Sequence, residues 1–180
     1  MNYILIGLLL VLVIFVILIY NRIIKLKHML NEAWSGVDVQ LKRRHDLIPN
    51  ILESVKAYSN YEKDLFTKIA DIRSGFSKNS GIKETGEKEN VFTGALKSVF
   101  ALAEAYPDLK ANNNFLNLQK TLTEIENELQ LARRYYNGTV RNYNIAIQTF
   151  PGMLVAGPAK FVPEEFFEIE LASERQVPHV

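Results

Sequence analysis

The sequence predicts an all-α protein, with an N-terminal transmembrane helix followed by an antiparallel, up-and-down four-helix bundle of long helices. Three observations predict this fold class. Eighteen uncharged residues follow Asn2. Four later stretches carry apolar residues at alternating steps of 3 and 4, which is typical of helices with one apolar face. No stretch beyond the apolar run alternates with the period of two that a half-buried strand requires.

The uncharged run from Tyr3 to Tyr20 reads YILIGLLLVLVIFVILIY. At about 1.5 Å per residue it is roughly 27 Å long, close to the hydrocarbon thickness of a bilayer. A cleaved signal peptide is the main alternative, but it would need positive charge before the run and small residues at a cleavage site. The run instead ends in Ile-Tyr-Asn-Arg, so we expect an uncleaved anchor.

The charges beside this run predict its orientation. Arg22, Lys25 and Lys27 follow the run before the first acid, Glu32, whereas no charged side chain precedes it. Positive charge is retained on the cytoplasmic side of a membrane. We therefore expect the N-terminus outside and the C-terminal body in the cytoplasm.

The four apolar stripes predict helices at about 21–45, 49–76, 91–106 and 115–150. The polar, Gly-containing segment at about 77–90 reads as a flexible loop. Four one-sided apolar stripes are all buried if the helices pack together as a bundle. The expected organisation is an anchor at 1–20, a helical bundle at 21–152 and a tail at 153–180, with one short helix in the tail opened by Pro163.

The stretch RRHDLIPN at 43–50 interrupts strong helical patterns. Pro49 lacks a backbone N–H and is tolerated only in the first turn of a helix. We expect a break or sharp kink near 46–48, forming a corner, with Asp46 capping the next helix.

Composition excludes several classes of function. The formal net charge is +1, which gives no general case for nucleic-acid binding, and the absence of cysteine excludes thiolate metal sites and a cysteine nucleophile. The three histidines are far apart, and no Glu-x-x-His pair or Gly-rich phosphate loop is present. We therefore expect no catalytic residues, no metal site and no cofactor.

The candidate interaction patch is Arg43, Arg44, His45 and Asp46. Its cations could bind an anionic headgroup, RNA or an acidic partner, but such a run is more often a solvated face. We expect His45 to be a solvated corner residue and both arginines to contribute little to stability.

The acidic, aromatic tail is a second candidate. It either folds back on the basic first helices or forms an exposed hook for another protein, made by Phe161, Glu164, Glu165, Phe166 and Phe167.

Aromatic residues of the last helix predict packing. We expect Tyr135, Tyr136, Tyr143 and Phe150, with Trp34, in the core, because exposed aromatics would instead mark a docking face. Gly138 is unfavourable inside a helix and predicts close helix approach there, either within the bundle or to a partner.

The ordered motifs resemble the LemA family. They are Trp34, RRHDLIPN, AEAYPDLKANNNF, RRYYNGTVRNYNIAIQTFPG and the tail FVPEEFF. The resemblance covers most of the chain after the anchor. It implies a bacterial, membrane-anchored helical bundle of the four-helix type, and it implies no particular biochemical activity.

Three functions follow as hypotheses. The first is a non-enzymatic, single-pass membrane scaffold or adaptor that presents a helical surface to membrane-associated proteins. The second is a self-associating, membrane-organising protein, a homo-oligomer of long helices. The third is a ligand-binding or hydrolytic bundle that uses the polar stretch at 43–50.

Overall fold

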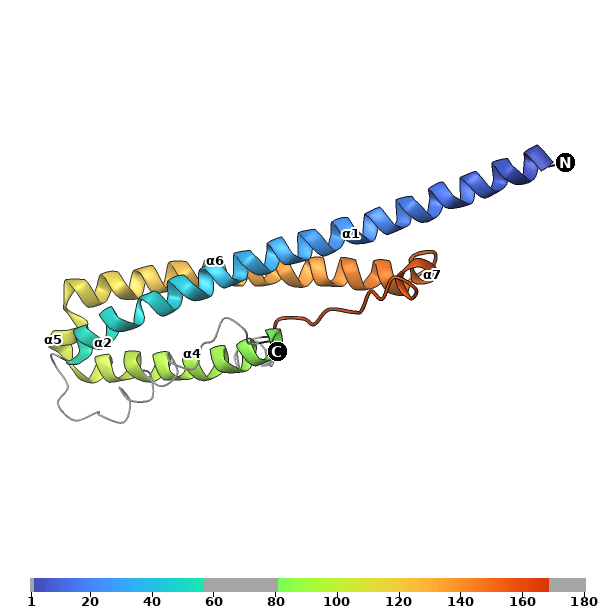
Figure 1. Ribbon diagram of the computed structural model, residues 1–180. Helices are drawn as coiled ribbons and strands as arrows, with labels where there is room; N and C mark the ends of the chain where they lie inside the picture. The colour runs from blue at the N-terminus through green and yellow to red at the C-terminus, as the bar shows by residue number, and fades with distance from the viewer. Residues whose placement is uncertain (1, 57–80, 169–180) are drawn as a thin grey trace, which may run out of the picture. The chain divides into compact units, whose positions relative to one another are not determined.

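The computed structural model describes residues 2–56 and 81–168, and every regular element in those ranges is a helix (Figure 1). The predicted all-α class is therefore confirmed. Contacts divide the chain into two compact units, to which α1 and α6 both contribute. The first unit holds 1–37 and 132–166, and the second holds 38–131 and the residues from 167 onward. The helices are α1 (Asn2–Asp46), α2 (Ile48–Lys56), α4 (Ile82–Ala105), α5 (Pro107–Lys110), α6 (Asn113–Gln148) and α7 (Gly152–Ala156).

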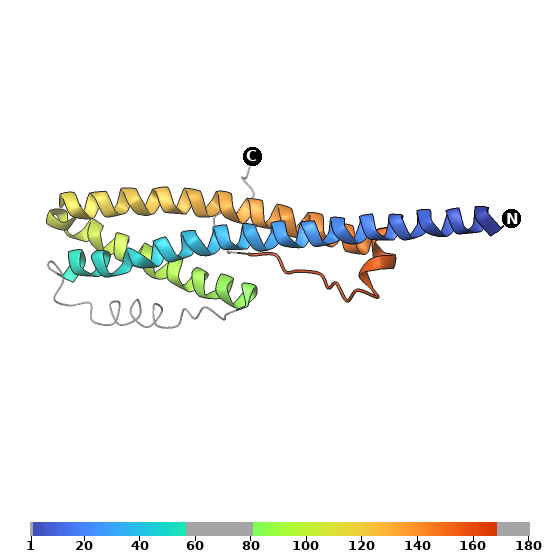
Figure 2. The same ribbon diagram turned by 45° about the horizontal axis from the view of Figure 1, so that its top comes forward.

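The N-terminal part of α1 has the properties of a membrane span. Residues 2–18 are exposed, and α1 is the one helix within the described residues that is long and apolar enough to cross a bilayer. Both views show this part of α1 extending past α7 (Figures 1 and 2). An exposed apolar helix of this length is unfavourable in water and favourable in lipid.

The first unit packs α1 against the C-terminal part of α6. The Trp34 and Tyr136 rings lie 5.2 Å apart between centroids. The predicted stripes are buried here apart from Leu26 and Ala132, which are half-buried, and Phe150, which is 75% exposed because α6 ends at Gln148 before reaching it. The buried stripe residues of this unit are Ile23, Leu30, Ala33, Val37, Tyr136, Val140, Tyr143 and Ile147.

The second unit has its own apolar core between α2, α4, α5 and α6. Here α2 and α4 run in the same direction, and α6 returns antiparallel to both (Figures 1 and 2). Most of the helix predicted at 49–76 lies outside the described residues, so the four-helix arrangement stays a prediction. The core residues are Ile48, Ile51, Val55, Phe92, Ala95, Leu96, Val99, Ala103, Leu109, Phe115 and Leu122.

The predicted break in RRHDLIPN is a one-residue interruption. Helix α1 ends at Asp46, Leu47 is a turn residue and α2 begins at Ile48, which places Pro49 in a first turn, where its missing N–H has no helical partner to lose. The expected corner is wrong, because α2 continues in the direction of the last turns of α1 (Figure 2). The Leu47 N–H donates to the Arg44 carbonyl at 3.3 Å, which keeps the chain helix-like through the interruption.

The loop expected at 77–90 is wrong for its described part, because α4 begins at Ile82. Lys88 and Glu84, one turn apart, form an ion pair at 2.7 Å that supports the first turns. Gly86 and Glu89 are buried in the second unit. Tertiary contacts thus hold as helix a polar segment whose local sequence predicts a loop.

Two connections differ from the prediction in detail. Pro107 ends α4 as expected and opens the short α5, because the residue before a proline favours an extended conformation and proline suits a first helical position. Asn112 caps α6, accepting the N–H groups of Asn114 at 2.9 Å and Phe115 at 3.3 Å through Oδ1.

The C-terminal segment has one short helix, but not where it was expected. Helix α7 follows the cis Phe150–Pro151 peptide bond, whereas residues 161–168, including Pro163, are not helical. Their backbone carbonyls instead accept hydrogen bonds from side chains of α6 and are not paired as in a helix.

Candidate functional site

The four residues of the candidate patch have different environments. Arg43 is exposed and donates to the Gln40 side chain at 3.1 Å, and Asp46 is exposed as the last residue of α1. Arg44 is only 1% exposed, and His45 is largely covered. The expectation of solvated Arg44 and His45 side chains is therefore wrong, as is the expectation that Asp46 begins the next helix.

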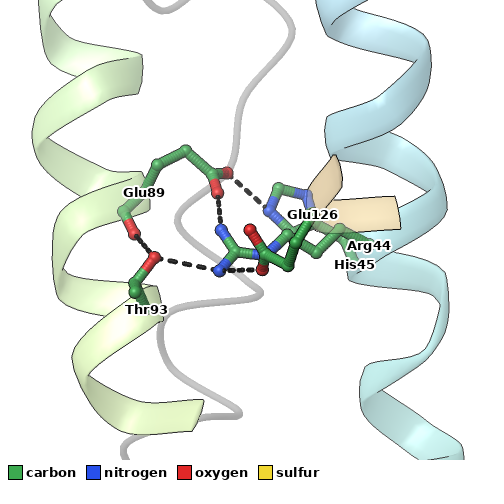
Figure 3. A network of polar contacts seen from close by, with 5 residues as sticks. All are labelled: Arg44, His45, Glu89, Thr93 and Glu126. Carbon is green, nitrogen blue, oxygen red and sulfur yellow. Dashed lines mark hydrogen bonds and ion pairs between the residues drawn. The ribbon is translucent and has the colours of Figure 1, made fainter. Parts of the chain in front are cut away.

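Arg44 is the centre of a polar cluster in the second unit (Figure 3). Its Nη1 lies 2.7 Å from Oε2 of Glu89, which is fully buried on α4. Its Nη2 donates to Thr93 Oγ1 at 2.9 Å and lies 2.6 Å from Glu126 Oε1. The guanidinium therefore connects α1, α4 and α6 through charge-assisted contacts, which are the stronger class of hydrogen bond.

Both carboxylate oxygens of Glu89 are occupied. His45 Nε2 lies 2.7 Å from Oε1, and because a carboxylate can only accept, this nitrogen is the donor. The Thr93 hydroxyl donates to the Glu89 backbone carbonyl at 2.9 Å while it accepts from Arg44. The contacts with Arg44 and His45 fix the Glu89 carboxylate between α1 and α4.

An aromatic ring covers the cluster. The Arg44 guanidinium carbon lies 4.8 Å from the centroid of the Phe92 ring, and the His45 ring meets the same ring edge-on at 5.3 Å. A cation over a ring face is attracted by the quadrupole of the ring. Arg44 Nε has no hydrogen-bond partner in the described part of the chain.

The geometry makes the cluster a structural connection. Its charged groups point at one another, and within the described residues no group of three His, Asp or Glu side chains is placed to hold a metal ion. A buried ion pair adds little net stability compared with an apolar pair of similar volume, because both charges lose their hydration.

The tail residues are held along α6 in the first unit. Asn144 Nδ2 donates to the Glu164 carbonyl, and Asn144 Oδ1 accepts the Glu164 N–H, both at 2.9 Å. The Tyr136 hydroxyl donates to the Glu165 carbonyl at 2.9 Å, and the Tyr143 hydroxyl donates to the Val162 carbonyl at 3.2 Å. Side chains of α6 therefore hold the tail through hydrogen bonds to its backbone.

Aromatic residues of the expected hook divide between exposed and covered positions. The Phe161 ring packs on Tyr20 with centroids 5.7 Å apart, and Phe166 is exposed. In the second unit Phe167 is fully buried next to Gly86, where an added Cβ would lie 2.6 Å from the Glu168 carbonyl oxygen. The expectation of a fully exposed hook is wrong for Phe167 and for the Glu164 backbone.

The tyrosines that hold the tail have perturbed acidity. Burial and, to a smaller extent, the charges of Glu164 and Glu165 raise the pKa of Tyr136 above its ordinary value. Burial and Glu164 raise the pKa of Tyr143. Both effects disfavour a phenolate, so both hydroxyls stay available as donors to the tail carbonyls.

The opposite side of α6 carries exposed apolar residues. Tyr135 is 55% exposed and Ile145 is 51% exposed. Gly138 and Asn142 lie between them at steps of 3, 4 and 3, which places all four on one helix face. An added Cβ on Gly138 would meet no atom within 4 Å. The expected core position of Tyr135 is wrong, and the close approach at Gly138 is not made by the described residues of this chain.

Sequence reasoning missed Glu89, Thr93 and Glu126 as parts of the cluster. A signal was nevertheless present. Arg44 occupies the stripe position between Leu41 and Ile48, at steps of 3 and 4. Glu89 occupies the position one step before Phe92 on the stripe of α4. Opposite charges at core positions of two helices predict a buried pair.

Comparison with known proteins adds relatives to this description. The chain is 29% identical over 135 residues to Protein LemA of Metamycoplasma hominis, which covers 72% of this chain and 60% of that relative. It is 22% identical over 184 residues to Magnetosome protein MamQ 2 of Paramagnetospirillum magneticum, covering 88% of this chain and 68% of the relative. Magnetosome protein MamQ of Magnetospirillum gryphiswaldense is 20% identical, again covering 88% of this chain and 68% of the relative.

A family model gives the broader assignment. The model of the LemA family matches residues 33–180, which is most of the chain and includes the Arg44 cluster, all of α6 and the tail. The family resemblance of the sequence motifs is thereby confirmed, and the chain belongs to the LemA family.

Proposed function

We propose that this protein is a non-enzymatic, single-pass membrane scaffold that uses the exposed face of α6 to bind a helix of a membrane-associated protein. The observation that carries the proposal is the α6 docking face, defined as Tyr135, Gly138, Asn142 and Ile145. Two exposed apolar side chains flank a glycine whose Cβ position is open. Small residues between larger apolar ones let a second helix approach closely.

The charges beside the α6 docking face specify the partner further. Arg134 and Arg141 are exposed and lie together along one edge of the face. An apolar helix with acidic residues at its edge would complement this surface, because opposite charges guide encounter and fix register. The partner we propose is therefore an amphipathic helix with an apolar stripe and an acidic border.

The polar cluster supports a non-enzymatic role for this protein. The Arg44, His45 and Glu89 groups that a hydrolytic bundle would need are engaged with one another. A group that acts on a substrate must instead reach it within hydrogen-bond distance. We propose that the cluster holds the helices of the second unit in register.

Crosslinking in native membranes tests the docking face. A photoreactive amino acid at position 142 should capture a partner protein, and the same group at the exposed Lys97 of α4 should not. Gly138→Leu should abolish capture with unchanged folding, because the added side chain points into open space. Gly94→Leu is the matched control, since Gly94 is also helical with nothing within 4 Å.

The outcomes separate the two function classes. Capture of a second copy of this chain, and of nothing else, would support the self-associating alternative. Equal capture by positions 142 and 97, or capture that survives Gly138→Leu, would overturn the docking face.

We further propose that the body lies in the cytoplasm. The support is the run of Arg22, Lys25 and Lys27 directly after the apolar segment of α1. Because the chain has no cysteine, Ser98→Cys introduces one exposed thiol. A membrane-impermeant maleimide should label it only after cells are opened, and labelling of intact cells would contradict the orientation.

A further inference from the structure

The first unit has a second apolar surface, around α7. Phe150, Met153 and Leu154 are 75%, 52% and 62% exposed, respectively. They follow one another within five residues, in a turn where the Met153 N–H donates to the Thr149 carbonyl and the Leu154 N–H donates to the Pro151 carbonyl. It is unfavourable in water to expose three large apolar side chains on so short a segment. Such a surface is typical of a site that contacts an apolar environment.

The position of this surface along α1 is fixed by several contacts. A groove of about 310 Å³ is lined on one side by α1, from Ile19 to Leu26, and on the other by Phe150 and Gly152 together with the end of α6. The α6 part of this lining includes Asn142 and Ile145, so the groove adjoins the α6 docking face. These α1 residues are the ones at which the apolar run gives way to the first cation. The surface around α7 therefore lies beside the end of the proposed membrane span.

Two further contacts hold the segment rigidly at this level. Gly152 packs so closely on α6 that an added Cβ would overlap the Ala146 carbonyl oxygen. The Phe161 ring lies against Tyr20, with centroids 5.7 Å apart. Tyrosine at the end of a span is typical of the membrane–water interface.

We propose that Phe150, Met153 and Leu154 insert into the interfacial layer of the same leaflet through which α1 leaves the bilayer. This inference rests on the proposed span of α1. The occupant is lipid because the surface lies beside Ile19 and Arg22, where the apolar run of α1 ends. The exposed Lys160 nearby in sequence adds a cation suited to phosphate headgroups. The first unit would then contact the membrane at two places, which fixes the tilt and rotation of this unit.

Site-specific fluorescence tests this insertion in the full chain. The protein lacks cysteine, so Met153→Cys and Leu154→Cys each accept one environment-sensitive fluorophore. Leu9→Cys, 64% exposed within the proposed span, is the deep control, and Leu116→Cys, 44% exposed on α6 in the other unit, is the aqueous control. Each variant is placed in nanodiscs of zwitterionic and anionic phospholipid that hold one copy of the chain.

We expect labels at 153 and 154 to show blue-shifted emission and quenching by lipids that carry a nitroxide near the headgroup. The label at 9 should be quenched by a nitroxide deep in the acyl chains. The label at 116 should be quenched by aqueous iodide at least several-fold more strongly than either membrane label.

Three results would overturn the inference. If labels at 153 and 154 behave like the label at 116 while the label at 9 is shielded, α1 spans the membrane but α7 stays in water. If the label at 9 is also accessible to iodide, the span itself fails. If shielding at 153 and 154 needs two copies per disc, the surface binds a second chain and not lipid.

Discussion

Arg44 on α1 and Glu89 on α4 form a buried ion pair, with 2.7 Å between Nη1 and Oε2 and side-chain exposures of 1% and 0%. The two residues are 45 positions apart, and the pair gains further contacts from His45, Thr93 and Glu126. Removing Glu89 leaves the buried Arg44 with only the partly exposed Glu126 as a carboxylate partner among the described residues, which is far more unfavourable than losing an exposed pair.

Glu89→Ala should therefore destabilise the protein by about 3–5 kcal/mol, because Arg44 and His45 lose their carboxylate. Glu87→Ala, two residues away and exposed on the same helix, should change stability by less than about 0.5 kcal/mol. Chemical denaturation followed by far-UV circular dichroism measures both.

The double variant Arg44→Met with Glu89→Met separates the charge effect from the packing effect. It should be more stable than Glu89→Ala, because an apolar pair leaves no buried charge uncompensated. Equal stability of Glu89→Ala and Glu87→Ala would mean that the pair is not buried in solution.

Much of the core was predictable from spacing alone. The stripes of the first, third and fourth predicted helices are buried almost residue by residue, because a period near 3.6 places them on one face. The Arg44–Glu89 pair was not predicted, although both residues occupy stripe positions. A charged residue such as Arg44 interrupts an apolar stripe unless its buried partner is known. That partner, Glu89, lies in a segment whose polar composition favours a loop.

The placement of the tail also depends on contacts that the sequence does not encode locally. Its acidic charges suggested attraction to the basic first helices, but Asn144, Tyr136 and Tyr143 bind its backbone instead. Main-chain carbonyls are present in every residue, so no residue type marks such a binding segment. Pro163 predicted a helix start, and tertiary hydrogen bonds took precedence over that local preference.

Asp46 does not begin the helix that it was expected to cap, and a side-chain cap is found at Asn112 of a different helix, α6. The Asn112 side chain accepts two backbone N–H groups at the start of α6, whereas Asp46 ends α1. Asn112→Ala should destabilise by about 1 kcal/mol, and Asp46→Ala by clearly less. Thermal melts of the two variants in parallel measure the difference. A larger loss of stability for Asp46→Ala would indicate that Asp46 does cap a helix.

Gly152 is required for the close approach of α7 to α6. A methyl group there would overlap the Ala146 carbonyl oxygen, so Gly152→Ala should destabilise the protein by about 3 kcal/mol through forced backbone movement. Gly157→Ala is the matched control, since its nearest neighbour would be the Met153 carbonyl oxygen at 3.7 Å, an ordinary contact. Similar melting temperatures for both variants would contradict the packing of α7.

Tyr136 gives the protein a specific sensitivity to alkaline pH. Burial, followed by the charges of Glu164 and Glu165, raises its pKa in the folded state, so the neutral hydroxyl is favoured in the fold. The unfolded chain loses this proton at about pH 10, and the folded chain loses it only at higher pH. The resulting stabilisation is fully present below about pH 10 and is lost as the pH rises from there toward the folded pKa.

Tyr136→Phe should therefore have an effect on stability that depends on pH. Near about pH 8 it should lower the free energy of unfolding by about 1 kcal/mol, because the hydrogen bond to the Glu165 carbonyl is lost. Above about pH 10 the difference from the native chain should shrink, because only the native chain has this proton to lose on unfolding. Tyr135→Phe, at the exposed neighbouring position, should follow the native chain throughout. Denaturant titrations at a series of pH values measure the three curves, and parallel curves for Tyr136→Phe and the native chain across about pH 8 to 11 would contradict the assignment.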